Sequence, residues 1–155
     1  MKIVQTKDTM SEIYLDALRI RNHVFVEEQQ VPLTLEIDEN EAYSVHFVLY
    51  VKGVAKATVR LLPMDATHVK VQRMAVEKDA RGQGYGQFLL EAAEDFAQKQ
   101  GFTQITLGAQ LSARPFYEKS GYVARGPIFL DAGIEHVEMT KALTPATPNT
   151  SGFEL

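Results

Sequence analysis

Short runs of apolar residues recur along the first half of the chain, and their spacing predicts β-strands. Four such runs are rich in β-branched and aromatic residues, at 2–6, 45–51, 54–62 and 68–76. Lys52-Gly53 separates the second run from the third, and Pro63 ends the third. This order of strand, turn, strand, loop and strand predicts an antiparallel meander.

Two longer segments have the spacing of amphipathic helices. Over 85–100, apolar residues recur at i, i+1, i+4 and i+5, and Gly101 stands where a glycine C-cap belongs. Residues 11–27 show a similar stripe, with Ser11 as the expected N-cap and a break near Asn22. Both segments are therefore predicted to pack one apolar face on a sheet.

The second half of the chain continues with shorter elements. Strands are predicted over 102–107, from Gly121 onward, and over 133–141, and a short helix over 112–119 with Ser112 as its cap. Pro, Thr, Asn, Ser and Gly dominate residues 144–152, which predicts a loose tail over 144–155. The pattern is that of an α/β (α+β) fold, with one sheet and helices on its faces.

Composition limits the possible functions. The 155 residues suit one domain, over 1–143, and a chain of this size buries roughly 70% of its unfolded surface. No cysteine is present, which excludes a disulfide framework, Cys-ligated zinc and a thiol nucleophile. Sixteen basic and 20 acidic residues give a net charge of −4, which argues against nucleic acid as a partner.

The chain shows no sign of membrane insertion or export. Its first residues lack the apolar run of a secretory signal, and no apolar stretch approaches the ~20 residues that span a bilayer. We therefore expect a cytoplasmic protein without a membrane partner.

Residues 81–86 (RGQGYG) carry the strongest chemical signal. Three glycines and an arginine stand between a predicted strand end and a long helix. Glycines let the backbone approach an anion closely, and the free amides of a first helical turn point toward it. The segment matches neither a P-loop nor a dinucleotide fingerprint. We predict a phosphate cradle; the alternative is a tight connection with no ligand.

Three ordered motifs resemble the GNAT superfamily of acyl-CoA-dependent N-acetyltransferases. Residues 81–86 resemble its R/Q-x-x-G-x-G/A motif, 71–76 its central strand, and 116–122 (FYEKSGY) its F-Y-x-x-x-G-F/Y motif. Gln110 and Ala113 stand where the family often has Asn and Ala. The resemblance covers roughly residues 2–142, outside the tail.

A narrower resemblance is to the ElaA-like branch. Residues 21–29 (RNHVFVEEQ) are similar to its R-x-x-V-F-V-x-E-Q segment, and 133–139 to its G-I-x-H-x-x-M ending. Residues 36–41 and His46 resemble its E-x-D-x-x-D stretch and following His, but Asn40 or Glu41 replaces the second Asp.

The resemblance implies both fold and reaction. The fold would be a mixed, mostly antiparallel sheet of six to seven strands, flanked by about four helices, with a splayed central strand. The reaction would transfer acetyl from acetyl-CoA, as cosubstrate and without a metal, to a primary amine of a small molecule or peptide. The amine would attack directly in a ternary complex, on a monomer or homodimer.

The resemblance also assigns the cosubstrate site. The pyrophosphate would lie on the amides of 83–86, and the pantetheine arm along the strand near Met74 and Val76. The N–H of Met74 or Ala75 would polarise the thioester carbonyl. The residues expected to bind acetyl-CoA are Met74, Ala75, Val76, Arg81, Gly82, Gln83, Gly84, Tyr85, Gly86, Gln110 and Ala113.

Direct transfer needs an acid for the leaving thiolate and a base for the amine. Tyr117 matches the family's acid, although a phenol beside Phe116 can also be a core residue. The base stays open among His136, His46, Glu28 and a water chain. Each histidine lies on a predicted strand, where a structural hydrogen bond is the commoner role.

Other features leave alternatives open. Four of the six residues at 36–41 are acidic, and we expect a solvated loop there; the alternative is an acidic lip that attracts a cationic ligand. Arg73 is interpreted as a structural ion-pair partner rather than a phosphate contact. The competing functions are a catalytically idle acyl-CoA-binding module and an enzyme of related fold that makes a signalling lactone.

Overall fold

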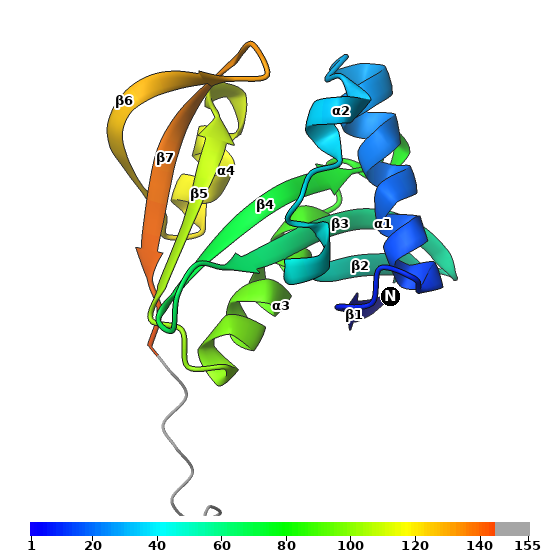
Figure 1. Cartoon of the computed structure of the whole chain (residues 1–155), viewed down its shortest axis with the longest axis horizontal. Helices are drawn as coiled ribbons and strands as arrows, with labels where there is room; N and C mark the ends of the chain where they lie inside the picture. Colours follow the sequence, from blue (N-terminus) through cyan, green and yellow to red (C-terminus); the bar gives the residue numbers. More distant parts are fainter. Residues whose placement is uncertain (145–155) are drawn as a thin grey trace, which may run out of the picture.

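The computed structural model describes residues 1–144, so the predicted tail lies outside the described residues apart from Thr144. Seven strands form one sheet in the order β1-β2-β3-β4-β5-β7-β6 (Figure 1). They are β1 (Lys2–Thr6), β2 (Val45–Val51), β3 (Val54–Pro63), β4 (His68–Val76), β5 (Gln104–Gln110), β6 (Val123–Asp131) and β7 (Ile134–Ala142). β4 and β5 run parallel, and every other neighbouring pair is antiparallel.

Four α-helices accompany the sheet in the described chain: α1 (Glu12–Arg21), α2 (Leu33–Glu36), α3 (Tyr85–Lys99) and α4 (Arg114–Lys119). The expected helix over 11–27 does change character at Asn22, where a π-helical turn begins and runs to Glu28. The amide of Tyr14 donates to the Ser11 hydroxyl at 3.2 Å, so the predicted N-cap is confirmed. No helix in residues 1–144 is long and apolar enough to cross a membrane.

Several predicted boundaries were wrong. The strand expected over 102–107 spans Gln104–Gln110, because Phe102 still belongs to the turn that ends α3. Ser112 does not cap α4, which instead follows a 3-10 turn and has no side-chain cap among the described residues. The short helix α2 was not predicted.

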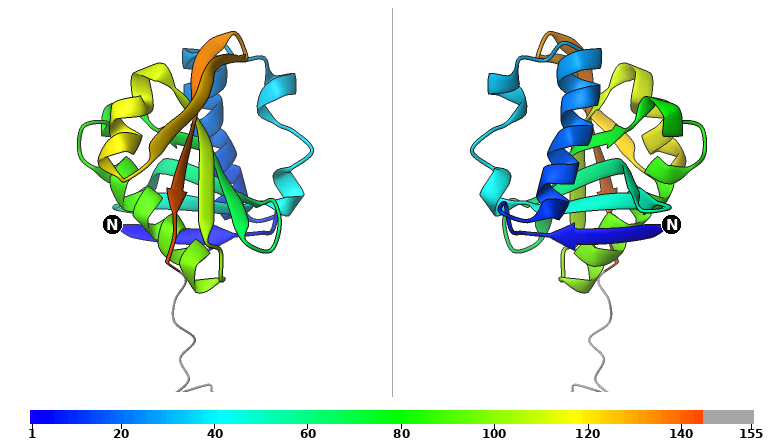
Figure 2. Two further views of the ribbon diagram at one scale, coloured as in Figure 1. Left: turned by 90° about the vertical axis from the view of Figure 1, so that its left-hand side faces the viewer. Right: turned by 90° about the vertical axis from the view of Figure 1, so that its right-hand side faces the viewer.

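The period of two along the strands separates two cores. Phe47 of β2 faces α3, where Leu89 and Ala93 are fully buried. Val48, the next residue along, faces α1 and packs in a second cluster with Ile20. The two helices therefore cover opposite faces of the sheet (Figure 2). Each fully buried large aliphatic side chain contributes roughly 1.5–3 kcal/mol through burial.

The sheet splits between its two parallel strands. Pairing of β4 with β5 stops at Val71 and Leu107, although both strands continue beyond this pair. Figure 1 shows the two strands diverging upward from their shared base. The expected splayed central strand is therefore confirmed.

A β-bulge in β4 lies directly beyond the split. Between its pairs with Arg60 and Thr58, β4 has two residues, Arg73 and Met74, opposite one residue of β3. Arg73 takes up the irregularity with a φ of 59°, in the left-handed region that non-glycine residues rarely occupy. A bulge of this kind re-aims the strand that carries it.

The acidic stretch 36–41 is not a solvated loop, and this expectation was wrong. Glu36 is 3% exposed and Glu41 is 8% exposed, because three arginines pair with three of the four carboxylates of this segment. We call the group the arginine–carboxylate cluster; its members are Arg21, Arg60, Arg73, Glu36, Asp38 and Glu41. The alternative of an acidic lip fails for the same reason, since arginines neutralise three of the four carboxylates and only Glu39 is exposed.

Candidate active site

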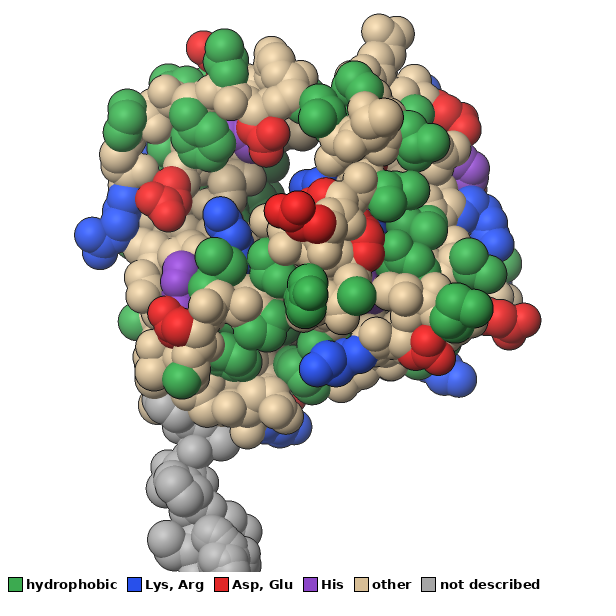
Figure 3. Space-filling model, viewed as in Figure 1, with side chains coloured by type: hydrophobic (Ala, Val, Ile, Leu, Met, Phe, Trp, Pro, Cys, Tyr) green, Lys and Arg blue, Asp and Glu red, His purple; other side chains and the backbone are tan. Residues whose placement is uncertain are grey.

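A cavity of about 620 Å³ occupies the split between β4 and β5. Its walls come from the bulged end of β4, the end of β5, the start of α3, the π-helical turn and the β6–β7 hairpin. Figure 3 shows the surface hollowed between this hairpin and α2. The volume lies within the range of small-molecule sites in proteins.

The N-terminus of α3 forms one wall of this cavity. Gly84 is its N-cap and has a φ of 83°, a conformation that glycine adopts without strain. The first turn carries no acidic residue, and no described side chain caps its amides. The amides of Tyr85 and Gly86 precede the first helical hydrogen bond, from Phe88 to Gly84. This wall therefore presents uncapped donors and the positive end of the helix dipole.

Arg81 lines the cavity, but its guanidinium is already engaged. It donates to both carboxylate oxygens of Glu28 at 2.7 Å, and its Nε donates to the Val76 carbonyl at 3.0 Å. The hydrogen bond from Arg81 lowers the pKa of Glu28. Glu28 does not line the cavity in the described structure. Its geometry favours a link between the glycine loop and the π-helical turn over the role of a base.

Other residues expected at the cosubstrate site lie on two sides of the cavity. Met74, Ala75 and Val76 line it from β4, while Gln110 and Ala113 line it from the end of β5 and the turn after it. Gly82 also lines it. The Gln83 side chain is outside the lining and accepts a hydrogen bond from the Tyr85 hydroxyl at 3.2 Å.

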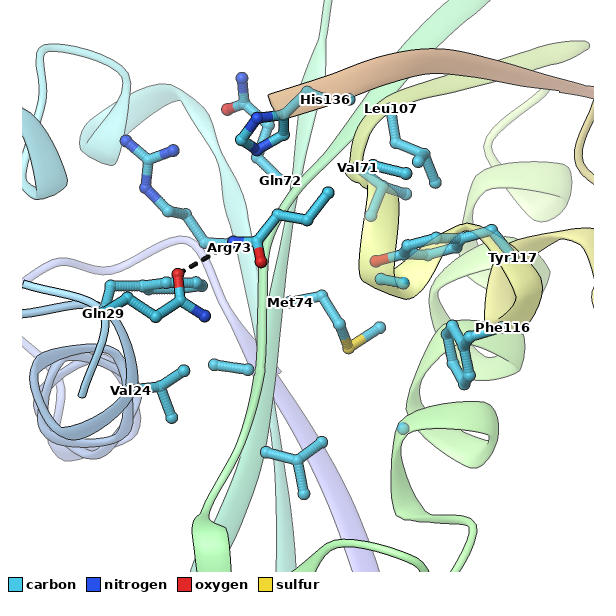
Figure 4. A pocket seen from close by; sticks show the side chains of 18 of the residues that line it. Val24, Gln29, Val71, Gln72, Arg73, Met74, Leu107, Phe116, Tyr117 and His136 are labelled. Carbon is cyan, nitrogen blue, oxygen red and sulfur yellow. Dashed lines mark hydrogen bonds between the residues drawn. The ribbon is translucent and has the colours of Figure 1, made fainter. Parts of the chain in front are cut away.

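Tyr117 projects from α4 into the split (Figure 4). It is 7% exposed and packs edge-on against Phe116 and Tyr122, with ring centroids 5.0 and 5.8 Å away. Burial raises the pKa of its phenol, so the hydroxyl keeps its proton at neutral pH. No described residue forms a hydrogen bond with this hydroxyl, although it lies at the cavity wall. A buried phenol with no protein partner is available to a ligand.

His136 faces the same cavity from β7 (Figure 4). Its Nδ1 lies 2.7 Å from the carbonyl oxygen of Ile134. Because a carbonyl oxygen only accepts, Nδ1 carries the hydrogen in the neutral ring, and Nε2 keeps its lone pair. Phe129 stacks on the ring at a centroid distance of 5.7 Å. The arrangement holds one basic nitrogen in a defined orientation.

His46 occupies a different environment. It is 1% exposed, and its Nε2 donates to the Glu41 carbonyl at 2.9 Å. Burial lowers its pKa, and its ring packs edge-on against Tyr14 at 4.8 Å. His46 does not line the cavity. Its contacts are those of a structural residue beside the arginine–carboxylate cluster.

Gln29 and Phe129 are among the cavity residues that were not predicted from the sequence. Gln29 accepts a hydrogen bond from Gln110 Nε2 at 2.9 Å, drawn as the dashed line in Figure 4. It ends the segment that resembles the ElaA-like branch, so that match could have indicated it. Phe129 lies over Gly108, where an added Cβ would stand 3.2 Å from its ring. No local pattern marks Phe129, because β6 is exposed at every position except Ala124.

Comparison with known proteins agrees with this geometry. The family model described as "Acetyltransferase (GNAT) domain" matches residues 16–143. "Uncharacterized N-acetyltransferase YjcF" of Bacillus subtilis (strain 168) is 40% identical over 142 residues, which cover 91% of this chain and 99% of that protein.

Solved structures show the same relationship. An acyl-CoA N-acyltransferase from Pseudomonas aeruginosa is similar with a TM-score of 0.80 and 29% identity, covering 91% of this chain and 99% of its own. Escherichia coli ElaA has the same TM-score of 0.80 and the same coverage at 23% identity, so its likeness shows the fold. The family match spans most of the described residues and includes all three motifs. The chain belongs to the GNAT family of acetyltransferases.

Proposed function

We propose that this chain transfers the acetyl group of acetyl-CoA to a primary amine of a small molecule or peptide, by direct attack within a ternary complex. One observation carries the proposal: the uncapped, acid-free N-terminus of α3 opens onto the cavity made by the β4–β5 split. The name of the Pseudomonas aeruginosa relative supports an acyl-CoA donor. We place the reaction in the cytoplasm, on a monomer or homodimer.

The residues present suit a coenzyme A thioester. The amides of 83–86 would hold the pyrophosphate, because uncapped amides at a helix N-terminus bind anions. Main-chain groups of Met74 and Val76 are released from β5 by the split and would pair with the amide groups of the pantetheine arm. Gln110 and Ala113 would form the opposite wall. When bound, acetyl-CoA supplies an acetyl group activated as a thioester.

Two side chains would handle the protons. His136 Nε2 takes a proton from the acceptor ammonium, which frees the nitrogen lone pair for attack on the thioester carbon. The main-chain N–H of Met74 or Ala75 donates to the carbonyl oxygen as negative charge develops there. As the C–S bond breaks, the Tyr117 phenol protonates the leaving sulfur, and the second proton of the amine nitrogen restores the phenol. The balance is an ammonium and a thioester giving an amide, a thiol and one proton.

Calorimetric titration with acetyl-CoA and with CoA tests the donor site. Gly84→Glu places a carboxylate among the α3 amides, and we expect at least tenfold weaker binding of both ligands. Gly101→Glu is the matched control, because Gly101 follows the same helix and has a φ of 93° with no atom near its added Cβ. It imposes the same strain and charge at the far end of α3, and binding should be unchanged.

Turnover is measured by release of the CoA thiol in the presence of a panel of primary amines. The chain has no cysteine, so a thiol reagent reports CoA without a protein background. Binding together with thiol release and mass-detected N-acetylation of an amine supports the proposal. A wild-type protein that binds neither ligand sinks it. Binding without transfer to any amine would favour the idle acyl-CoA-binding module.

A further inference from the structure

Arg73 combines an unfavourable backbone conformation with an unusual set of contacts. Its φ of 59° is one that glycine adopts more easily than arginine. Its Nε lies 2.8 Å from a Glu36 carboxylate oxygen, and its Nη2 lies 3.1 Å from Asp38 Oδ2. The same guanidinium donates to the Leu35 and Glu36 carbonyls at 3.2 Å each. The bulge residue is thus tied to the segment around α2.

The two carboxylates that pair with Arg73 also pair with two other arginines. Glu36 accepts from Arg21 at 2.8 Å, and Asp38 accepts from Arg60 at 2.8 Å. Arg21 and Arg60 are each 1% exposed and come from α1 and β3. Three arginines balance three carboxylates in the cluster. Because a buried charge without a partner is costly, these positions are mutually dependent.

The conformation of Arg73 affects the direction of the main chain directly after the bulge. Met74 and Ala75 have left the ladder with β5, so their main-chain directions are not set by pairing on that side. The backbone torsions of Arg73 set the plane of the Arg73–Met74 peptide, and with it the direction of the Met74 N–H, at the point where β4 re-enters its ladder with β3 through Ala75 and Thr58. A glycine at this position would adopt the same torsions more easily. The backbone conformation therefore does not account for the arginine side chain.

We infer that Arg73 is a positioning residue: Glu36 and Asp38 clamp its guanidinium, and this clamp fixes the bulge so that the N–H of Met74 or Ala75 points into the cavity at the donor carbonyl. The inference rests on the proposed function, because the carbonyl belongs to the acetyl thioester. It assigns the acidic segment 36–41 a role in the geometry of the site, without contact to the donor. Misplacement of such donors by about 1 Å costs roughly 100-fold in rate.

The test compares Arg73→Gly with Arg73→Lys and uses isotope-edited infrared spectroscopy of bound [1-¹³C]acetyl-CoA. In the wild type, hydrogen bonds to the thioester carbonyl should lower its stretching frequency relative to free acetyl-CoA. Arg73→Gly keeps the bulge torsions accessible but loses the clamp. We expect its band to return toward the free value and kcat to fall about 100-fold. CoA affinity should change less than threefold, and Arg73→Lys should recover part of both readouts.

A milder variant guards against failure to fold. Asp38 is partly exposed, so Asp38→Asn removes one carboxylate charge without opening the core, and it should shift the band in the same direction by less. Arg19→Ala, which breaks an exposed pair with Asp16, is the control and should move neither readout. An unchanged band and kcat in Arg73→Gly overturn the inference while the proposed function stands. A wild type that does not bind acetyl-CoA overturns both.

Discussion

Tyr117 combines a buried ring with a hydroxyl at the cavity wall. Its hydroxyl lies at the cavity wall, and its raised pKa keeps the phenol protonated. The sequence placed this residue in a motif and left open whether it packs or reacts. In the structure the ring packs between Phe116 and Tyr122, while the hydroxyl has no described partner and is accessible from the cavity.

Tyr117→Phe removes one hydroxyl that forms no hydrogen bond with the described residues. We expect an unchanged fold and CoA affinity, and a fall in kcat of about 100-fold, since general acid catalysis contributes 10²–10⁴. Thiol release at saturating acetyl-CoA and amine measures the effect. Tyr122→Phe is the matched control, because Tyr122 donates to Glu94 at 2.8 Å in the core. It should lower the melting temperature and spare kcat; full turnover by Tyr117→Phe would reject the acid role.

At the scale of elements, the start of α1 depends on local sequence, whereas the π-helical turn after it matters through its tertiary contacts. Ser11 starts the helix through a hydrogen bond to the Tyr14 amide, three residues away, which needs no contact with the rest of the fold. The turn Asn22–Glu28 is different: Gln29 donates its amide to the Val24 carbonyl, five residues back. The wider turn brings Gln29 to the cavity, where it meets Gln110. A π-helical segment often accompanies a functional site.

Ser11→Ala tests the local part of this account. Loss of the cap leaves the Tyr14 amide without its partner, which should lower the free energy of unfolding by about 1 kcal/mol. For a chain of this size, that corresponds to roughly 2–4 °C in melting temperature. Ser11→Asp retains a capping oxygen and should stay within about 0.5 kcal/mol of the wild type. Equal losses in both variants would show that the cap does not hold α1.

At the scale of the whole molecule, the arginine–carboxylate cluster joins α1, β3 and β4 through the segment 36–41. Burial on its own raises carboxylate pKa values, and it does raise that of Glu36. For Glu41, burial is outweighed by the hydrogen bond and charge of Arg21 and by Arg60, so its pKa falls well below 4.5. The two glutamates therefore contribute with opposite signs to the pH dependence of stability.

Glu41→Gln isolates the contribution of Glu41. A carboxylate whose pKa is lowered by folding stabilises the native state above its unfolded pKa, and this contribution is lost as pH falls below it. We expect Glu41→Gln to cost about 3 kcal/mol at pH 7, because it breaks a buried ion pair. Its deficit relative to the wild type should shrink as pH falls below 4.5, the ordinary value for glutamate.

Thermal melts of both proteins at several pH values between 7 and 3 measure this difference. Glu118→Gln, in an exposed pair with Arg114, is the control and should track the wild type throughout. A deficit of Glu41→Gln that stays constant with pH would contradict the lowered pKa of Glu41. Glu36 is present in both proteins, so its opposite contribution largely cancels in the comparison.

The sequence by itself determined the features that depend on neighbouring residues. Strand and helix periods, the Ser11 cap and the glycine turn before α3 follow from short-range sterics and hydrogen bonding. The motifs at 71–76, 81–86 and 116–122 are also local, and they were enough to identify the family. The order of the meander followed from its short connections.

The tertiary structure alone decided which polar groups became buried, and with what partners. The acidic run 36–41 looks like solvent-facing sequence, because its arginine partners lie 15 or more residues away in the chain. Glu28 and Arg81 are also far apart in the chain, so their pairing could not be predicted from local sequence. The same holds for the different environments of His136 and His46. A charge enters the interior only when folding brings it an opposite charge, and no local pattern encodes that meeting.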